Sequence, residues 1–313
     1  MPLKLSVPLI KCLAVPVLGI LFLLTPGLAW AQQPGVAYNQ DVPIYYETFG
    51  SGSPILIING GPGMNSEGFR QIGALLAIKN QTIIYDQRGT GNSTLTEISQ
   101  NTITMELMAK DIEALRNHLG FESWVVFGHS FGGIMASYYA SKFPQVIDGL
   151  ILSASGGLDL DLLSYVGQNI TNRLTQKQRS DLSYWTSKLS AGDTTYNAKL
   201  QRGMALAPAY VQDTAHVPVI AGRLTQGNWD INGLVFQDLQ RIQYDCSEKL
   251  RSFSKPVLII QGKQDIIEER TALRAHAVFQ NSQLILLDSC GHYGWLDQKE
   301  AYLSAVYGFL EQF

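Results

Sequence analysis

The chain has 313 residues, of which 46% are apolar and 16% are charged, and its formal net charge is −3. This length and composition allow a full hydrophobic core and suit one large α/β domain, or one domain with an insertion. The mildly acidic balance, without a basic patch, zinc-finger spacing or heptad repeat, argues against a nucleic-acid partner.

The first 31 residues have the pattern of a secretory signal peptide. Lys4 and Lys11 give a basic start, and the run Cys12–Leu24 is almost wholly apolar. The sequence "LAWA", residues 28–31, then puts small residues at the −3 and −1 positions before Gln32. This pattern predicts export to the periplasm or medium with cleavage after Ala31. The alternative is a membrane anchor, but the apolar run is short for a span of roughly 20 residues. Cleavage would leave 282 of the 313 residues and, with two lysines lost, change the net charge from −3 to −5.

Two cysteines, Cys246 and Cys290, remain after this cleavage. In an oxidising compartment they could form a disulfide or stay as two buried thiols. We favour the thiols, although a bridge would brace the loop that carries His292.

Predicted strands and helices alternate through most of the chain. Two strands lie within 36–54, followed by a strand at 55–58, a helix at about 68–78, a strand at 82–85, a helix within 104–120, a strand at 124–128, a helix within 131–144 and a strand at 147–155. Near the C-terminus come a strand at 256–262, a helix at 268–279, a strand at 283–288 and a helix at 298–311. Continuous apolar strands alternating with helices predict an α/β fold, with a mostly parallel sheet covered on both faces.

This alternation breaks between Gly157 and Asp245, where the sequence is mainly helical, amphipathic and polar. We interpret residues 157–245 as a helical cap inserted into a core formed by residues 32–156 and 246–313. Ligands of open α/β sheets bind at the carboxyl edge of the strands. The cap is therefore expected to roof a pocket at that edge.

The segment "GHSFG", residues 128–132, fits the motif G-x-S-x-G between a predicted strand and a predicted helix. In that context the motif predicts a nucleophile elbow, a strained turn that exposes the hydroxyl of Ser130 at the top of the sheet. The flanking glycines leave room for close backbone, and the helix N-terminus favours developing negative charge. The alternative is a tight turn that contains a serine by chance.

A serine hydroxyl needs a base to become a good nucleophile. His292 follows a strand near the C-terminus and is the predicted base, while Asp265, after the preceding strand, is the predicted acid that fixes its tautomer. The order Ser130, Asp265, His292 is that of α/β-hydrolases. Two alternatives stay open for the acid: Asp265 could instead cap a helix, and Asp159 or Asp161 could take its place.

An acyl-transfer site also needs hydrogen-bond donors for an oxyanion. The backbone N–H of Phe131, directly after the serine, is one predicted donor. The other is the N–H of Gly61 in the sequence "NGGPG", residues 59–63, which we call the NGGPG loop. A phosphate cradle is the alternative, but the loop lacks the lysine and hydroxyl residue of a P-loop and the G-x-G-x-x-G spacing of a dinucleotide site. We predict no metal and no cofactor.

By their sequence and order, "NGGPG", "DQRGTGNS", "GHSFGG", "GKQD" and "CGH" resemble the proline iminopeptidase branch of the α/β-hydrolases. The resemblance covers nearly all of the chain after residue 31 but is weak across the cap. It implies a serine peptidase fold with a helical cap and no cofactor. It also implies that "DQRGTGNS", residues 86–93, packs and shapes the pocket floor.

The chain departs from this family at two places. Asn59 stands where the family usually has histidine, which changes the hydrogen bonds inside the NGGPG loop. The family also implies acidic cap residues that hold the free amino terminus of a substrate, and the best single candidate is Asp230, with Asp213 weaker. Both could instead be solvated carboxylates. Trp295, close to His292, is a further predicted substrate contact.

Together these features predict an exported serine hydrolase similar to proline iminopeptidases. It would act through an acyl-enzyme on an amide or ester of a small molecule or short peptide. One alternative is a carboxylesterase or another small-molecule acyl hydrolase without aminopeptidase activity, and another is an inactive binding protein on the same fold. The sequence leaves the oligomeric state open.

Overall fold

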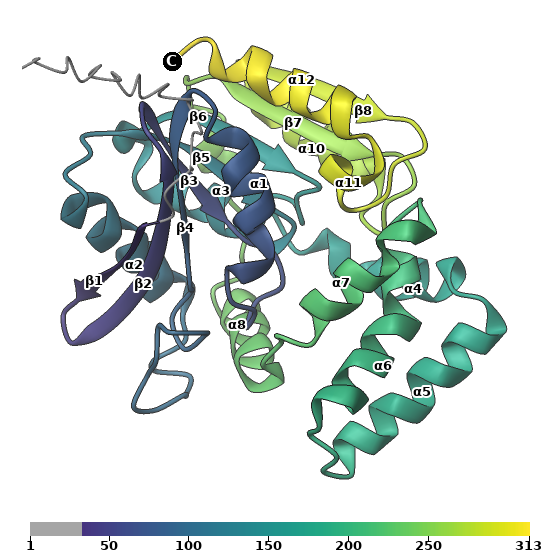
Figure 1. Ribbon diagram of the computed structural model, residues 1–313. Coiled ribbons are helices and arrows are strands. Elements are labelled where there is room, and N and C mark those ends of the chain that lie inside the picture. The colour runs from purple at the N-terminus through teal and green to yellow at the C-terminus, as the bar shows by residue number, and fades with distance from the viewer. Residues whose placement is uncertain (1–32) are drawn as a thin grey trace, which may run out of the picture.

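The computed structural model describes residues 33–313 (Figure 1). The predicted signal peptide, residues 1–31, lies outside the described residues. Within 33–313, every helix is too short or too polar to cross a membrane.

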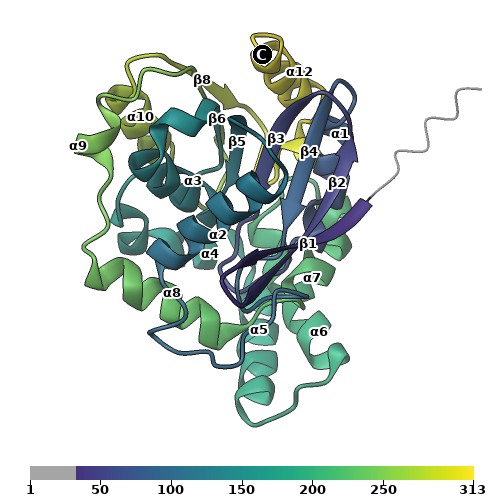
Figure 2. The ribbon, with the colours of Figure 1, turned by 90° about the vertical axis from the view of Figure 1, so that its left-hand side faces the viewer.

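A single twisted sheet runs through the core (Figures 1 and 2). Its strands are β1 (Gln33–Asn39), β2 (Val42–Gly50), β3 (Ser53–Ile58), β4 (Asn80–Tyr85), β5 (Trp124–His129), β6 (Ile147–Ser153), β7 (Val257–Gly262) and β8 (Ser282–Leu287). They are arranged in the order β1-β2-β4-β3-β5-β6-β7-β8. Strand β2 pairs antiparallel with β1 and β4, and all the other neighbours are parallel. The predicted α/β fold with a mostly parallel sheet is therefore confirmed.

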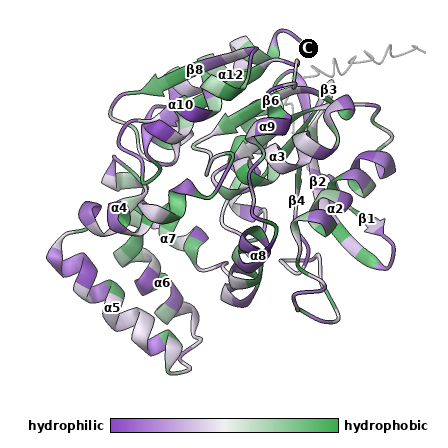
Figure 3. Cartoon of the chain, turned by 180° about the vertical axis from the view of Figure 1, so that it is seen from behind, coloured by the Kyte–Doolittle hydropathy of each residue, from purple (hydrophilic) through white to green (hydrophobic). Residues whose placement is uncertain are grey.

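Apolar side chains on both faces of this sheet pack against helices. Along β5, Trp124 and Val126 join the core on one face, while Val125 and Phe127 join the core on the other, because successive side chains of a strand point to opposite faces. The first core is closed by α2 (Met105–His118), α3 (Phe131–Lys142), α9 (Ser247–Leu250) and α10 (Glu269–Val278). The second is closed by α1 (Arg70–Leu76), α11 (Gly294–Asp297) and α12 (Lys299–Leu310). In Figure 3 strand β6, inside the sheet, is mostly hydrophobic, as this double burial requires.

The chain between β6 and β7 forms helices that project from the core (Figure 1). They are α4 (Val166–Arg173), α5 (Gln176–Ser190), α6 (Tyr196–Leu206), α7 (Val217–Leu224) and α8 (Trp229–Arg241), with short 3-10 turns among them. Helices α5 and α6 form an outer hairpin, and α5 has no buried residue and a largely hydrophilic surface (Figure 3). These helices occupy the segment predicted as the cap.

The two ends of this segment lie side by side. Asp159 and Asp245 form an antiparallel bridge, and the N–H of Cys246 donates to the carbonyl of Leu158 at 2.8 Å. The chain therefore leaves the core and returns to it at one place.

Cys246 and Cys290 are buried free thiols. They belong to the cores on opposite faces of the sheet. The structure therefore has two separate thiols, the option that the sequence favoured.

Candidate active site

Ser130 stands at the turn between β5 and α3 in a backbone conformation that few residues other than glycine adopt. Its φ and ψ are 58° and −122°, and such a strained residue costs on the order of 1–3 kcal/mol, so its surroundings must hold it there. A Cβ atom on Gly132 would collide with the carbonyl of Ile58, and one on Gly128 with the carbonyl of Gly132. Close backbone approach therefore requires both glycines, as in a nucleophile elbow.

Backbone hydrogen bonds fix this turn from both sides. The N–H of Ser130 donates to the carbonyl of Ser153 at 3.0 Å. The carbonyl of Ser130 accepts from the N–H groups of Gly133 at 2.9 Å and Gly156 at 3.0 Å. The side chain of Ser130 is half-buried and lines a pocket.

His292 and Asp265 form a buried pair at the carboxyl edge of the sheet, in the loops after β8 and β7. His292 Nδ1 lies 2.8 Å from Oδ1 and 3.1 Å from Oδ2 of Asp265. Because a carboxylate only accepts hydrogen bonds, Nδ1 carries the hydrogen and Nε2 is free to accept a proton. His292 lines the same pocket as Ser130.

Further hydrogen bonds hold the carboxylate in place. Asp265 Oδ2 accepts from Gln261 Nε2 at 2.8 Å, and Oδ1 accepts from the N–H of Ile267 at 3.1 Å. The N-cap position of α10 is Glu268, so Asp265 is not the cap residue of that helix. Its carboxylate is engaged with the histidine.

The two rival acids have other partners. Asp159 forms an ion pair with Arg274 at 2.9 Å. Asp161 lies 3.5 Å from Arg270. The structure thus pairs neither of them with His292.

The two predicted oxyanion donors meet at this pocket. Phe131 is the first residue of α3, so its N–H has no acceptor within the helix. Gly61, in the NGGPG loop, has a φ of +71°. Both residues line the pocket that contains Ser130.

Side-chain amides organise the NGGPG loop. Asn59 Nδ2 donates to the carbonyls of Gly60 and Met64, both at 3.1 Å. Gln87, from the "DQRGTGNS" segment, donates through Nε2 to the carbonyl of Asn59 at 2.9 Å. Asn59, where the resemblance led us to expect histidine, therefore supplies internal hydrogen bonds to the loop.

The pocket beside Ser130 is a small cavity of about 210 Å³ between the core and the cap. Its apolar lining consists of Met64, Phe131, Ile134, Ile266, Ile267 and Tyr293 from the core, and of Leu162, Leu163, Val166, Ile170, Leu206, Tyr210, Leu224, Trp229 and Phe236 from the cap. Among the described residues that line it, none is an aspartate, glutamate, lysine or arginine. The pocket thus suits a small, mainly apolar group.

The predicted substrate-binding residues lie elsewhere. Asp230 is exposed and lines an outer hollow of about 630 Å³ that also contains Lys199 and Arg202. Trp295 is buried in the core and packs against His129, with ring centroids 4.8 Å apart. Asp213 is exposed and caps a short turn by accepting from the N–H of residue 215 at 2.9 Å. The geometry therefore gives no support to a substrate contact from any of the three.

Sequence reasoning assigned no part to His129, which the structure places against the predicted base. The rings of His129 and His292 have centroids 4.7 Å apart. Burial, and then the neighbouring His292 and Arg223, hold the pKa of His129 well below its ordinary value. His129 is therefore a neutral packing partner of His292.

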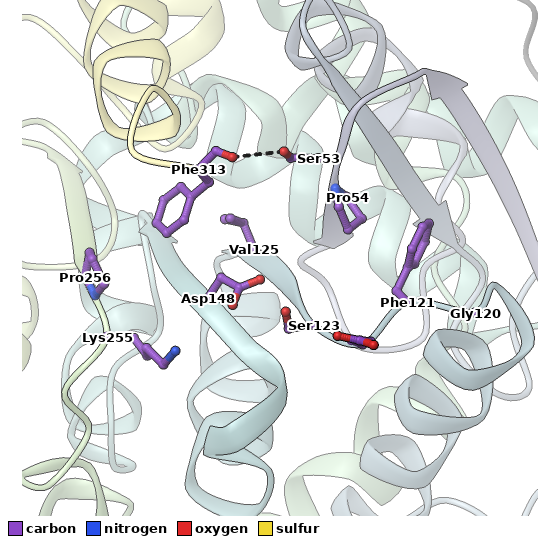
Figure 4. A pocket seen from close by; sticks show the side chains of 11 residues that line it. Ser53, Pro54, Gly120, Phe121, Ser123, Val125, Asp148, Lys255, Pro256 and Phe313 are labelled. Atoms are coloured by element: carbon purple, nitrogen blue, oxygen red, sulfur yellow. Dashed lines mark hydrogen bonds between the residues drawn. The ribbon is translucent and has the colours of Figure 1, made fainter.

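Another hollow, of about 570 Å³, lies at the opposite edge of the sheet (Figure 4). It is lined at the amino ends of β3, β5, β6 and β7 and by the C-terminal Phe313, whose carbonyl accepts from Ser53 Oγ at 3.1 Å. Ser130 follows the carboxyl end of β5, so this hollow is separate from the candidate site. In residues 33–313, no group of three or more histidine, cysteine, aspartate or glutamate residues is placed to hold a metal ion.

Comparison with known proteins agrees with this architecture. Residues 53–298 match the alpha/beta hydrolase fold family. The proline iminopeptidase of Lactobacillus helveticus (strain DPC 4571) is 25% identical over 280 residues, which cover 86% of this chain and 94% of that protein.

Solved structures share the fold. A proline iminopeptidase from Mycobacterium smegmatis has a TM-score of 0.70 at 21% identity and covers 90% of this chain and 98% of its own. An esterase from Rhodococcus sp. ECU1013 has a TM-score of 0.68 at 18% identity with the same coverage, 90% and 98%. The family match over residues 53–298 shows that this chain belongs to the α/β-hydrolase fold family, and its curated relatives make it a hydrolase similar to proline iminopeptidases.

Proposed function

We propose that this protein is a serine hydrolase that acts through an acyl-enzyme with Ser130 as nucleophile. The observation that carries the proposal is the shared pocket of a strained, half-buried Ser130 and a His292 whose Nδ1 is bound to Asp265. The donors expected for an oxyanion, the N–H groups of Phe131 and Gly61, border the same pocket.

In the proposed reaction His292 Nε2 takes the proton of Ser130 while Oγ attacks the carbonyl carbon of the substrate. The N–H groups of Phe131 and Gly61 stabilise the oxyanion. His292 then gives the proton to the leaving alcohol or amine, which departs and leaves an ester on Ser130. Water, activated by the same histidine, hydrolyses that ester and releases the acid.

For the acyl group, the lining of the pocket supports a small, apolar moiety in an ester or an amide. This lining favours a carboxylesterase. A substrate with a free ammonium group would lose its hydration in the pocket without gaining a carboxylate partner, at a cost of several kcal/mol.

An aminopeptidase that releases N-terminal proline is the second candidate. It rests on the similarity to proline iminopeptidases. For the substrate amine the pocket lining offers the amide oxygen of Asn232 but no carboxylate.

The test is a matched panel of short p-nitrophenyl esters, acetyl-proline p-nitrophenyl ester and proline naphthylamide. We expect wild type to cleave the esters and to react with a fluorophosphonate probe. Ser130→Ala should lose both activities while keeping its melting temperature. Asp230→Ala should match wild type on every substrate, because Asp230 lies outside the pocket. Failure of wild type to label would instead favour an inactive binding protein on this fold.

We also propose that the protein is exported. The support is the signal-peptide pattern of the first 31 residues. Expression of the full chain in a bacterial host should yield a periplasmic or secreted product whose N-terminus, by sequencing, is Gln32. A product that retains Met1 would contradict export with cleavage.

A further inference from the structure

Arg223, on cap helix α7, is a buried cation without an acidic partner. It is 5% exposed, and no carboxylate in residues 33–313 forms an ion pair with it. Burying an ion costs several kcal/mol unless other interactions compensate. Its guanidinium lies 4.6 Å from the ring centroid of Phe69. Burial lowers the pKa of Arg223, but an arginine remains charged at neutral pH.

The guanidinium of Arg223 donates a hydrogen bond to the NGGPG loop. Arg223 Nη2 donates to the carbonyl oxygen of Gly60 at 2.9 Å. That carbonyl and the N–H of Gly61 belong to one peptide unit. Residues 33–313 contain no cis peptide bond, so the C=O and N–H of this unit point in opposite directions.

The peptide between Gly60 and Gly61 lies beside the serine. Gly60 and Gly61 line the pocket, and a Cβ atom on Gly60 would stand 2.6 Å from Cβ of Ser130. Holding the Gly60 carbonyl on the Arg223 side therefore aims the Gly61 N–H toward the pocket. A cation on the carbonyl oxygen also draws electron density from the N–H and makes it a stronger donor.

We propose that Arg223 is a positioning residue for the oxyanion hole, which orients and polarises the peptide between Gly60 and Gly61 from the cap. The inference rests on the proposed function and deepens it. The other donor, the N–H of Phe131, is fixed by the core helix α3. Both donors therefore belong to the core, and the cap contributes the cation that, together with the Asn59 amide at 3.1 Å, holds the Gly60 carbonyl.

The test separates binding of the ground state from binding of the transition state. A boronic acid that bonds to Ser130 forms a tetrahedral anion like the reaction intermediate, whereas KM for an ester reflects the uncharged substrate. For Arg223→Met we expect kcat and the affinity for the boronic acid to fall together by about 10- to 100-fold. KM should change less than about threefold, because the hydrogen bond to the oxyanion strengthens only in the transition state and contributes little to binding of the uncharged substrate. Arg223→Lys, which keeps the charge and one donor, should recover part of the loss.

A matched control is Arg202→Met. Arg202, also in the cap, lies 4.6 Å from the ring centroid of Trp229 and donates to Thr186 Oγ1 at 3.2 Å. This variant loses a stacked cap cation too, but should keep the ratio of boronic acid affinity to KM.

Two results would overturn the inference. One is an active Arg223→Met enzyme with unchanged kcat and boronic acid affinity. The other is equal weakening of KM and boronic acid affinity, which marks a structural role only. If Arg223→Met does not fold, the same ratio is read from Arg223→Lys. Wild type that neither turns over esters nor labels would refute the proposed function itself, so the two failures are distinguishable.

Discussion

Asp265→Asn tests the acid of the proposed triad with a change of almost no volume. Both oxygens of Asp265 accept hydrogen bonds, Oδ1 from His292 and Ile267 and Oδ2 from Gln261. An asparagine must turn its NH₂ toward one of these sets of donors. Gln261 cannot easily rotate to accept, because its Nε2 also donates to the carbonyls of Gly262 at 3.2 Å and Ile267 at 3.0 Å.

Each orientation of the amide has a defined cost. With NH₂ toward Gln261, two buried donors face each other, which lowers the free energy of unfolding by about 1–3 kcal/mol. With NH₂ toward His292, the imidazole is held in the tautomer that carries hydrogen on Nε2 and cannot take the serine proton. Both orientations remove the negative charge that stabilises the imidazolium. We therefore expect kcat to fall by about 10⁴-fold, the size of effect known for such a change in a serine triad.

The assay is ester hydrolysis by the variant, with its folding checked by urea unfolding. Asp161→Asn is the matched control, since it makes the same chemical change at a rival acid that does not line the pocket, and its kcat should match that of wild type. A folded Asp265→Asn protein that loses less than tenfold in kcat would refute the assignment of Asp265.

Three other predictions concern stability and reactivity. Burial holds the pKa of His129 in the folded protein well below its ordinary value. As the pH falls through about 6.5, His129 therefore takes up a proton only in the unfolded chain. This uptake lowers the free energy of unfolding by up to about 1.4 kcal/mol per pH unit. Between pH 7.5 and 5.5 wild type should therefore lose about 1.4 kcal/mol more free energy of unfolding than His129→Leu in urea unfolding. Equal losses would contradict the lowered pKa. Asp111→Asn should lower the free energy of unfolding by about 3–5 kcal/mol in the same assay. It breaks a buried bidentate pair with Arg88, in which both hydrogen bonds are 2.6 Å long. A decrease of less than about 1 kcal/mol would contradict this prediction. Burial raises the pKa of Cys290 to about 12 and also raises that of Cys246. Neither thiol should therefore react with Ellman's reagent until the protein unfolds. Rapid reaction of the native protein, or fewer than two reactive thiols after unfolding, would contradict two buried free cysteines.

The sequence predicted the core well because its strands are uninterrupted apolar runs between turn residues. The strand predicted at 124–128 is β5, Trp124–His129, and the helix predicted at 268–279 is α10, Glu269–Val278. The short helices α9 and α11 were missed, since four residues cannot display a helical period. The juxtaposition of His292 and Asp265 followed from a topological rule, because loops after parallel strands open at the same edge.

The cap could be predicted only as helical. Amphipathic spacing indicates a helix but does not say which neighbour its apolar face will cover. Asp230 was therefore assigned to the substrate from its place in the sequence, whereas in the structure it faces the outer hollow. The contact of Arg223 with Gly60, 163 residues apart, leaves no local pattern, since tertiary packing alone brings the two together.

Because the two ends of the cap lie side by side at Leu158 and Cys246, the whole segment between them could be replaced as one insertion. A different helical insertion could be grafted at that junction without altering the strand order or the elbow that follows β5. Such a graft would bring a new pocket lining to an unchanged Ser130. Under the role proposed for Arg223, the incoming helix would also need a cation placed to donate to the Gly60 carbonyl.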